Sequence, residues 1–144
     1  MANITDFPAR GRIIEANGDA ITFQPTGTNY QLHLRLAPGQ PAPQAGGRSV
    51  EAMISVRARK IWTVRSGGNF VAPIFGPPKT IQGRVKWLDE RTLVVHAGMP
   101  FVVEMPASDD AIDLANGAIA VSSMVNLTAL PGAVIELGVP TVAG

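Results

Sequence analysis

The 144-residue chain contains no cysteine. Without thiols it can form neither a disulfide framework nor a thiolate metal site, and it has no cysteine nucleophile. It also lacks any apolar run close to the roughly 20 residues that a membrane-spanning helix needs. Its first residues show neither the basic start nor the apolar stretch of a secretory signal. These absences predict a cytoplasmic protein that does not associate with a membrane.

Aromatic residues make up only 6% of the chain and charged residues 16%, whereas the residues AVILMFWYC make up 46%. A chain of this composition is apolar enough to fold around a packed core. The 15 glycines and 12 prolines are spread along it and favour many turns between short strands over long helices. The length allows one ordinary domain, or two very small ones that share a boundary, and we expect the second arrangement.

An internal repeat supports two similar halves. Gly11 and Gly83 lie 72 residues apart, and each begins a strand that runs into a polar turn, at residues 17–19 and 89–91. Two further strands match in the same order, at 20–23 with 92–95 and at 30–34 with 101–105. A connection and a last pair of strands then complete each half, at 49–64 and at 119–137.

The connections between these strands differ in the two halves. Residues 37–47 contain three prolines and three glycines, which predicts an irregular loop. Residues 108–117 predict one short helix, because Ser108 or Asp109 can cap its first turn and Asn116-Gly117 can end it. The strand order resembles that of small OB- and SH3-like barrels. We therefore predict an all-β protein of two tandem small β-barrel-like repeats, with one short helix in the second.

The predicted repeats are residues 1–76 and 79–144, joined by a stiff connector at Gly76-Pro77-Pro78. Residues 70–75 before this connector read as an edge strand that tolerates a proline. So short a connector implies that the two repeats touch. The expected contacts between them are three apolar side chains, Phe70, Ile74 and Phe75.

Charge is distributed unevenly along the sequence. Residues 1–78 hold eight basic and four acidic residues, a net charge of +4, whereas residues 79–144 hold four basic and seven acidic residues, a net charge of −3. The first repeat is thus basic and the second acidic. This asymmetry fits an anionic ligand on one side, or copies that stack head to tail with opposite charges facing.

Strict alternation of apolar and polar residues marks the strands around positions 30–36 and 50–57. The alternation becomes ambiguous at residues 59–62. A β-bulge there would decide whether Trp62 faces the core or the solvent, and the sequence leaves both orientations open.

Catalytic and metal-binding patterns are weak. His33 and His96 lie in different halves without ligand spacing around them, and the aspartates of residues 109–113 are better explained by a helix N-terminus. The serines lack a nucleophile-elbow context, and no phosphate-binding glycine loop is present. We therefore expect a protein that is not an enzyme and that holds no cofactor or metal ion.

The strongest binding pattern combines basic and aromatic residues. Single-stranded nucleic acid is held by cations that meet phosphates and by rings that stack on bases. The low aromatic content and the acidic second half argue against this role, and both tryptophans also suit core or interface positions. The candidate binding residues are Arg57, Arg59, Lys60, Trp62 and Arg65 in the first repeat, with Lys86 and Trp87 in the second.

The leading hypothesis is a non-catalytic binding or structural interaction module whose partner is a protein, including a second copy of itself as a homo-oligomer. One alternative is binding of single-stranded nucleic acid through the basic face of the first repeat. Another is capture of a small anion at the seam between the repeats. The sequence leaves open the identity of the partner, the oligomeric state, the barrel topology and whether the two repeats share one core.

Overall fold

The computed structural model describes residues 4–46 and 49–138. In these residues almost all regular structure is β-strand, which confirms the all-β prediction. The elements are η1 (Ile4–Asp6), β1 (Ala9–Asn17), β2 (Ala20–Pro25), β3 (Gln31–Leu36), β4 (Val50–Thr63), β5 (Phe70–Ala72), β6 (Phe75–Gly76), β7 (Thr80–Leu88), β8 (Thr92–His96), β9 (Pro100–Glu104), η2 (Asp109–Ala111), β10 (Ile112–Asp113), β11 (Met124–Ala129) and β12 (Val134–Leu137).

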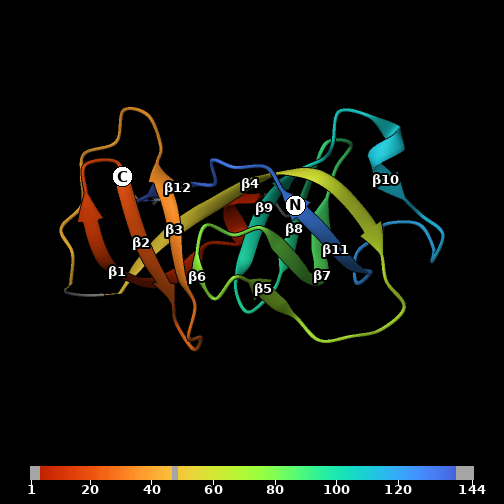
Figure 1. The fold of residues 1–144 in the computed structure, drawn as a ribbon, viewed down its shortest axis with the longest axis horizontal. Helices are drawn as coiled ribbons and strands as arrows, with labels where there is room; N and C mark the ends of the chain where they lie inside the picture. The colour runs from red at the N-terminus through yellow and green to blue at the C-terminus, as the bar shows by residue number, and fades with distance from the viewer. Residues whose placement is uncertain (1–3, 47–48, 139–144) are drawn as a thin grey trace.

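The strands pair in two closed circuits that share β4 (Figure 1). In the first circuit, β1 pairs with β2, β2 with β3, β3 with β12 and β12 with β4, which pairs again with β1. In the second circuit, β7 pairs with β8, β8 with β9, β9 with β4 and β4 with β11, which pairs again with β7. Each circuit holds one parallel pair, β3 with β12 and β9 with β4, and is otherwise antiparallel.

The strand β4 runs diagonally from one circuit into the other (Figure 1). Its first part pairs with β1 and β12, and from Ser55 onward it pairs with β9 and then β11. The strand β12, near the other end of the chain, pairs only with strands of the first circuit. Hydrogen bonds therefore cross the predicted boundary between residues 76 and 79 in both directions, and the division into two domains stays a prediction.

A β-bulge in β4 resolves the ambiguous alternation. Ala58 pairs with Ala129 and Lys60 with Thr128, so Arg59 is an extra residue in the ladder. Arg59 and Lys60 are consequently both exposed, and Ile61 is fully buried. Because side chains alternate after the bulge, Trp62 lies on the outer face of the sheet, where it is half-buried.

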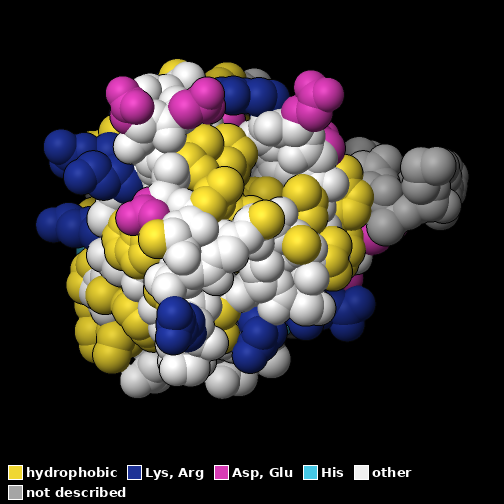
Figure 2. All heavy atoms as spheres, turned by 90° about the vertical axis from the view of Figure 1, so that its right-hand side faces the viewer, with side chains coloured by type: hydrophobic (Ala, Val, Ile, Leu, Met, Phe, Trp, Pro, Cys, Tyr) yellow, Lys and Arg dark blue, Asp and Glu magenta, His cyan; other side chains and the backbone are white. Residues whose placement is uncertain are grey.

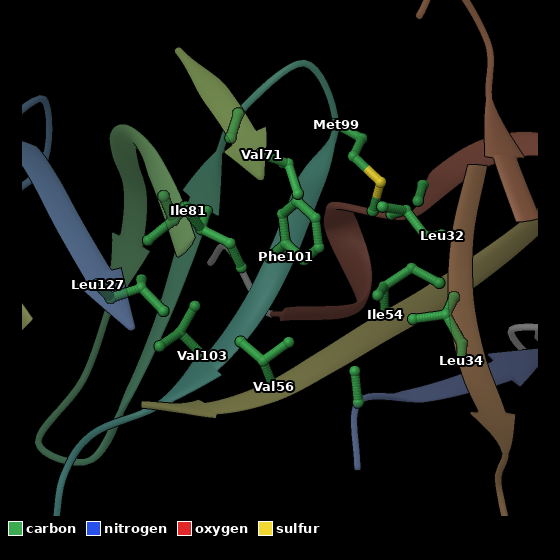
Figure 3. Close-up of a cluster of buried hydrophobic side chains, with 14 of the residues drawn as sticks. Leu32, Leu34, Ile54, Val56, Val71, Ile81, Met99, Phe101, Val103 and Leu127 are labelled. Atoms are coloured by element: carbon green, nitrogen blue, oxygen red, sulfur yellow. The ribbon is translucent and has the colours of Figure 1, made fainter. Parts of the chain in front are cut away.

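The buried side chains form one cluster that extends through both circuits. Figure 3 shows Ile54 and Val56 of β4 between the leucines of β3 and the side chains of the second circuit, among them Phe101. These residues are at most 4% exposed. The two circuits therefore share one core, and β4 supplies the side chains at its centre.

The predicted helix at residues 108–117 is wrong beyond its first turn. Ser108 does act as an N-cap, since its hydroxyl accepts a hydrogen bond from the Asp110 amide, but the 3-10 helix η2 has only three residues. Ile112 and the next residue then pair with β4 as the short strand β10. Strand pairing with β4 replaces the helix, and Asp113 accepts a hydrogen bond from the Ala115 amide instead of lying on a helix face.

The Pro/Gly connection of the first half is an irregular loop, as predicted, over residues 37–46; Gly47 lies outside the described residues. Gln40 ties this loop to β12. Its side-chain nitrogen donates to the Leu137 carbonyl at 2.8 Å, and its side-chain oxygen accepts from the Leu137 amide at 2.7 Å. The Gln40 side chain thus makes the two hydrogen bonds to the Leu137 backbone that a neighbouring strand would otherwise make.

Residues 70–76 form a segment that we call the strap, because β5 pairs with β7 of the second circuit and β6 pairs with β3 of the first. The predicted edge strand is therefore present in two short pieces. The contacts expected of Phe70, Ile74 and Phe75 between the halves stay a prediction, since these residues are 38%, 40% and 63% exposed and so only partly buried. Val71 is instead the strap residue that enters the core (Figure 3).

Gly11 and Gly83 occupy closely similar places on β1 and β7. A Cβ atom on either glycine would lie 2.2 Å from a carbonyl oxygen, that of Gln24 on β2 or that of His96 on β8. Each of these two strands also bulges a few residues further on, after Ile13 and after Val85. Close approach of the neighbouring backbone, not a turn, explains both glycines.

We expect Gly11→Ala and Gly83→Ala each to lower the free energy of unfolding by about 3 kcal/mol, because the new methyl group meets backbone that cannot move aside. Gly68→Ala is the matched control, since no atom lies within 4 Å of its Cβ position. Urea denaturation followed by circular dichroism measures the three values. Equal stability of Gly83→Ala and Gly68→Ala would contradict the close packing of β7 on β8.

We expect the fragments 1–76 and 79–144 to be unfolded when each is expressed alone. The first lacks β12 and the second lacks β4, so both circuits are open and buried strand edges are left unpaired. Mixing the two fragments restores every strand of both circuits. Dispersed amide signals in an NMR spectrum of the mixture, and their absence from each fragment, are the expected outcome. A fragment that folds alone contradicts the shared role of β4.

Candidate functional site

The first group of predicted binding residues lies where β4 passes between the circuits. Arg57 pairs with Glu104 of β9, with 3.5 Å between Arg57 Nε and the carboxylate. Both side chains are largely exposed, so this ion pair adds little stability. Arg59 and Lys60 follow at the bulge with exposed side chains.

Two cavities of about 300 and 340 Å³ adjoin this part of β4. Arg57, Arg91 and Glu104 line both of them. Arg91, which the sequence prediction missed, donates to the Pro106 carbonyl at 3.3 Å. The Glu104 carboxylate lies among these cations and offsets part of their charge. The anion site at the seam stays a prediction. Glu104 would lie inside that site, beside the bound anion.

Trp62 lies in a row of side chains on the outer face of the sheet. Its register partners are Asp113 of β10 and Asn126 of β11, and Asn126 in turn pairs with Gln82 of β7. The Asn126 side-chain nitrogen donates to the Gln82 side-chain oxygen at 2.9 Å. A carboxylate and an amide thus flank the indole ring, instead of the cations that a nucleic-acid backbone requires.

Lys86 and Trp87 lie on β7, separated from β4 by β11. Lys86 is the bulge residue of β7 and is exposed, whereas Trp87 is half-buried opposite Val94. The two tryptophans therefore lie on different strands with β11 between them. The nucleic-acid hypothesis stays a prediction, but its candidate residues are dispersed over several surfaces.

Arg65 lies apart from Arg57, at the opposite end of the second part of β4, beside a loop that follows β10. Its Nε donates to Asn116 Oδ1 at 3.2 Å. Arg84 of β7 lines the same cavity, of about 370 Å³, and donates to the Ser122 carbonyl at 2.9 Å. Neither Arg84 nor the loop was a candidate from the sequence, since no local pattern relates residues 65, 84 and 116.

Because β4 crosses from the first circuit into the second, the net charges of the two circuits differ from those of the two halves of the sequence. Among the described residues, the first circuit with its loops (4–46, 49–56 and 131–138) holds three basic and five acidic residues, a net charge of −2. The second circuit (57–130) holds eight basic and six acidic residues, a net charge of +2. In space the asymmetry is thus the reverse of that along the sequence. At the end formed by the second circuit, most acidic side chains lie along the top of the view, with one basic side chain among them, and most basic side chains lie at the left and below (Figure 2).

Within residues 4–46 and 49–138, no three His, Asp or Glu side chains lie close enough together to hold a metal ion. In the same part of the chain no helix has the length and apolar character needed to cross a membrane. No protein-family model matches the chain, and no curated protein is significantly similar to it.

His96, on β8 opposite Arg84, has a pKa below its ordinary value of 6.5, because burial disfavours the charged imidazolium and Lys86 repels it. The unfolded chain then binds the proton more tightly than the folded protein. Stability is complete above about pH 6.5 and falls as the pH drops through the range below it.

We expect the free energy of unfolding to decrease between about pH 8 and pH 5.5, measured by urea denaturation in a His33→Gln background that leaves His96 as the one histidine. Adding His96→Gln to this background removes the part of the slope that comes from the imidazole. An NMR titration that places the His96 pKa at or above 6.5 contradicts the expectation.

Proposed function

We propose that the protein is a non-catalytic interaction module, built from two small barrel-like repeats of the OB type, which associates with a second copy of itself through the strap. The observation that carries the proposal is the set of exposed apolar side chains on the strap. Strand order supports the two repeats, and the distribution of charge supports the second copy as the partner.

The equal order of the two circuits supports the repeats. Three consecutive antiparallel strands begin each circuit, the third pairs in parallel with a closing strand, and a fifth strand completes the ring. This is the arrangement of a small Greek-key barrel. In this interpretation β4 and β11 are equivalent in their pairing with β1 and β7. The last strand of each repeat then completes the circuit of the other repeat. The second part of β4 belongs to the second circuit, and β12 belongs to the first.

The matching contacts of Gly11 and Gly83 agree with the sequence repeat at a spacing of 72 residues. The third strands require a smaller spacing, because Leu32 pairs with Phe23 and Phe101 pairs with Val95. Leu32 and Phe101 are 69 residues apart, two fewer than in the sequence match of residues 30–34 with 101–105. The loop between β8 and β9 is shorter than the loop between β2 and β3, which accounts for the difference. A shift of two residues along a strand keeps the same side chains on the same face of the sheet.

The strap offers a fixed apolar surface. Val71 is anchored in the core, and the Gln31 amide donates to the Ile74 carbonyl at 2.8 Å. Phe70, Ile74 and Phe75 nevertheless remain exposed. In the described chain β5 pairs with β7 alone, so its other edge is available for a further strand. Apolar side chains beside an unpaired edge favour docking of another chain.

A second copy is the partner that the charges favour. The first circuit carries a net charge of −2 and the second +2 among the described residues, so two antiparallel copies bring opposite charges together. The strap pairs with a strand of each circuit and lies between the two circuits (Figure 1). A two-fold axis near the strap therefore combines apolar contact with electrostatic complementarity.

We expect the mass measured by light scattering to rise from monomer to dimer with increasing protein concentration. The dimer weakens at high salt but persists, because salt screens the charges and not the apolar contact. Phe75→Ser weakens association about tenfold or more, since the buried aromatic contact is lost. The largely exposed Phe75 contributes little to folding, so the variant remains stable.

Ile14→Ser is the matched control, because Ile14 is an exposed apolar residue on β1, away from the strap. It leaves the dissociation constant unchanged. A monomer at every concentration and at both salt levels would overturn self-association. Equal weakening by Phe75→Ser and Ile14→Ser would overturn the assignment of the strap as the interface.

A further inference from the structure

A polar cavity of about 370 Å³ lies at the end of the second circuit, where β4 and β7 meet the loop of residues 114–123. Figure 2 views the molecule from the side that carries β10 and β11. The cavity is lined chiefly by polar and basic side chains, among them Arg65, Arg84, Asn116, Ser122 and Ser123. It is separate from the strap and from the seam.

The two arginines flank the first residue of β11. The Val64 amide donates to the Met124 carbonyl at 2.9 Å, and Met124 pairs in register with Arg84 of β7. Because neighbouring strands lie about 5 Å apart, β4 and β7 are roughly 10 Å apart across β11. A guanidinium from each side can therefore reach a single small ligand between them.

Each guanidinium is oriented by a neutral acceptor. Arg84 Nη1 donates to the Ser122 carbonyl at 2.9 Å, and Arg65 Nε donates to Asn116 Oδ1 at 3.2 Å. Asn116 is held in turn, since its side-chain nitrogen donates to the Thr63 carbonyl at 3.2 Å. A guanidinium has five N–H donors, so most of the donors on both arginines are available to a ligand.

Charge distinguishes this cavity from those at the seam. None of the described residues that line it is acidic. In the described part of the chain neither Arg65 nor Arg84 forms a salt bridge, whereas Arg57 at the seam is paired with Glu104. Two cations thus share one cavity without a carboxylate to neutralise them.

The backbone beside Arg84 is strained. Ser122 has a φ of 80°, a conformation that residues other than glycine rarely adopt. It is held there because its amide donates to the Val85 carbonyl at 2.8 Å while its own carbonyl accepts from Arg84. Strain of this kind is often found where a loop must present groups to a ligand.

We propose that this cavity binds a phosphate-type oxyanion between Arg65 and Arg84. Planar guanidinium groups bind the oxygens of such an anion in pairs, which a lysine cannot do. The cavity is near the lower end of the size range of small-molecule sites and holds a tetrahedral anion with a small attached group. The site does not depend on self-association.

An NMR titration with inorganic phosphate at low ionic strength and constant pH tests the proposal. The expected result is a saturable shift of backbone amides at residues 63–65 and 116–124. Arg65→Gln and Arg84→Gln each raise the dissociation constant about tenfold or more, because each removes charge-assisted hydrogen bonds. Arg84→Lys gives an intermediate value, since it keeps the charge and loses the paired geometry.

Lys79→Gln is the charge-matched control, because Lys79 is exposed and lies outside the lining. It leaves the dissociation constant unchanged. Equal weakening by all three neutralising variants, or shifts spread over every basic residue, would show non-specific attraction and overturn the site. Absence of saturable binding overturns it as well. Well-dispersed spectra verify that each variant is folded.

A second titration, with a nucleoside monophosphate, distinguishes the source of the anion. Affinity equal to that for inorganic phosphate assigns the site to the free oxyanion. Tighter binding that Arg84→Gln abolishes assigns it to a phosphate ester. Tighter binding that Arg84→Gln leaves unchanged places the ligand elsewhere and counts against the proposal.

Discussion

Hydrogen bonding of both edges of β4 is the constraint on which the rest of the structure depends. Along its 14 residues this strand pairs first with β1 and β12 and then with β9, β11 and β10. A strand so placed cannot be removed without opening both circuits. The extra residue Arg59 lies within the pairing with β11, a few residues after the second circuit begins at Ser55, and a β-bulge of this kind bends a strand. We therefore expect the two circuits to unfold together, because the buried side chains of the described residues form one cluster that extends through both.

Local patterns predicted most of the strands and not their partners. Alternation marked β3 and the first part of β4, since a half-buried strand has the same pattern whichever neighbour it joins. For that reason the pairing of β12 with β3 and β4 could not be predicted. The helix expected after Ser108 failed for a related reason. Its capping signals were correct for one turn. Ile112 then pairs with Ile61, which is distant in the sequence, and this strand pairing outweighs the local helix propensity.

The candidate site was predictable only in part. Arg57, Arg59 and Lys60 do have exposed side chains near the middle of β4. Arg65 lies beyond the end of this strand, so the charges of the run do not act together. The cavity of Arg65 and Arg84 joins strands that are distant in sequence to a loop, and no spacing rule covers it. Charge counted along the chain also misled, because β4 carries Arg57, Arg59 and Lys60 into the second circuit. Topology, more than composition, determines where charge lies.

The outer row at Asn126 shows how this topology fixes a surface. Asn126 Oδ1 is buried without a donor in the described chain, which costs about 1–3 kcal/mol. The Asn126 side-chain nitrogen donates to the Gln82 side-chain oxygen. The Gln82 side-chain nitrogen donates in turn to the Gly68 carbonyl at 2.9 Å, just before β5. A valine at position 126 would avoid the cost but release Gln82. The unsatisfied oxygen thus accompanies a chain of hydrogen bonds that joins Asn126 of β11, through Gln82 of β7, to the backbone just before the strap.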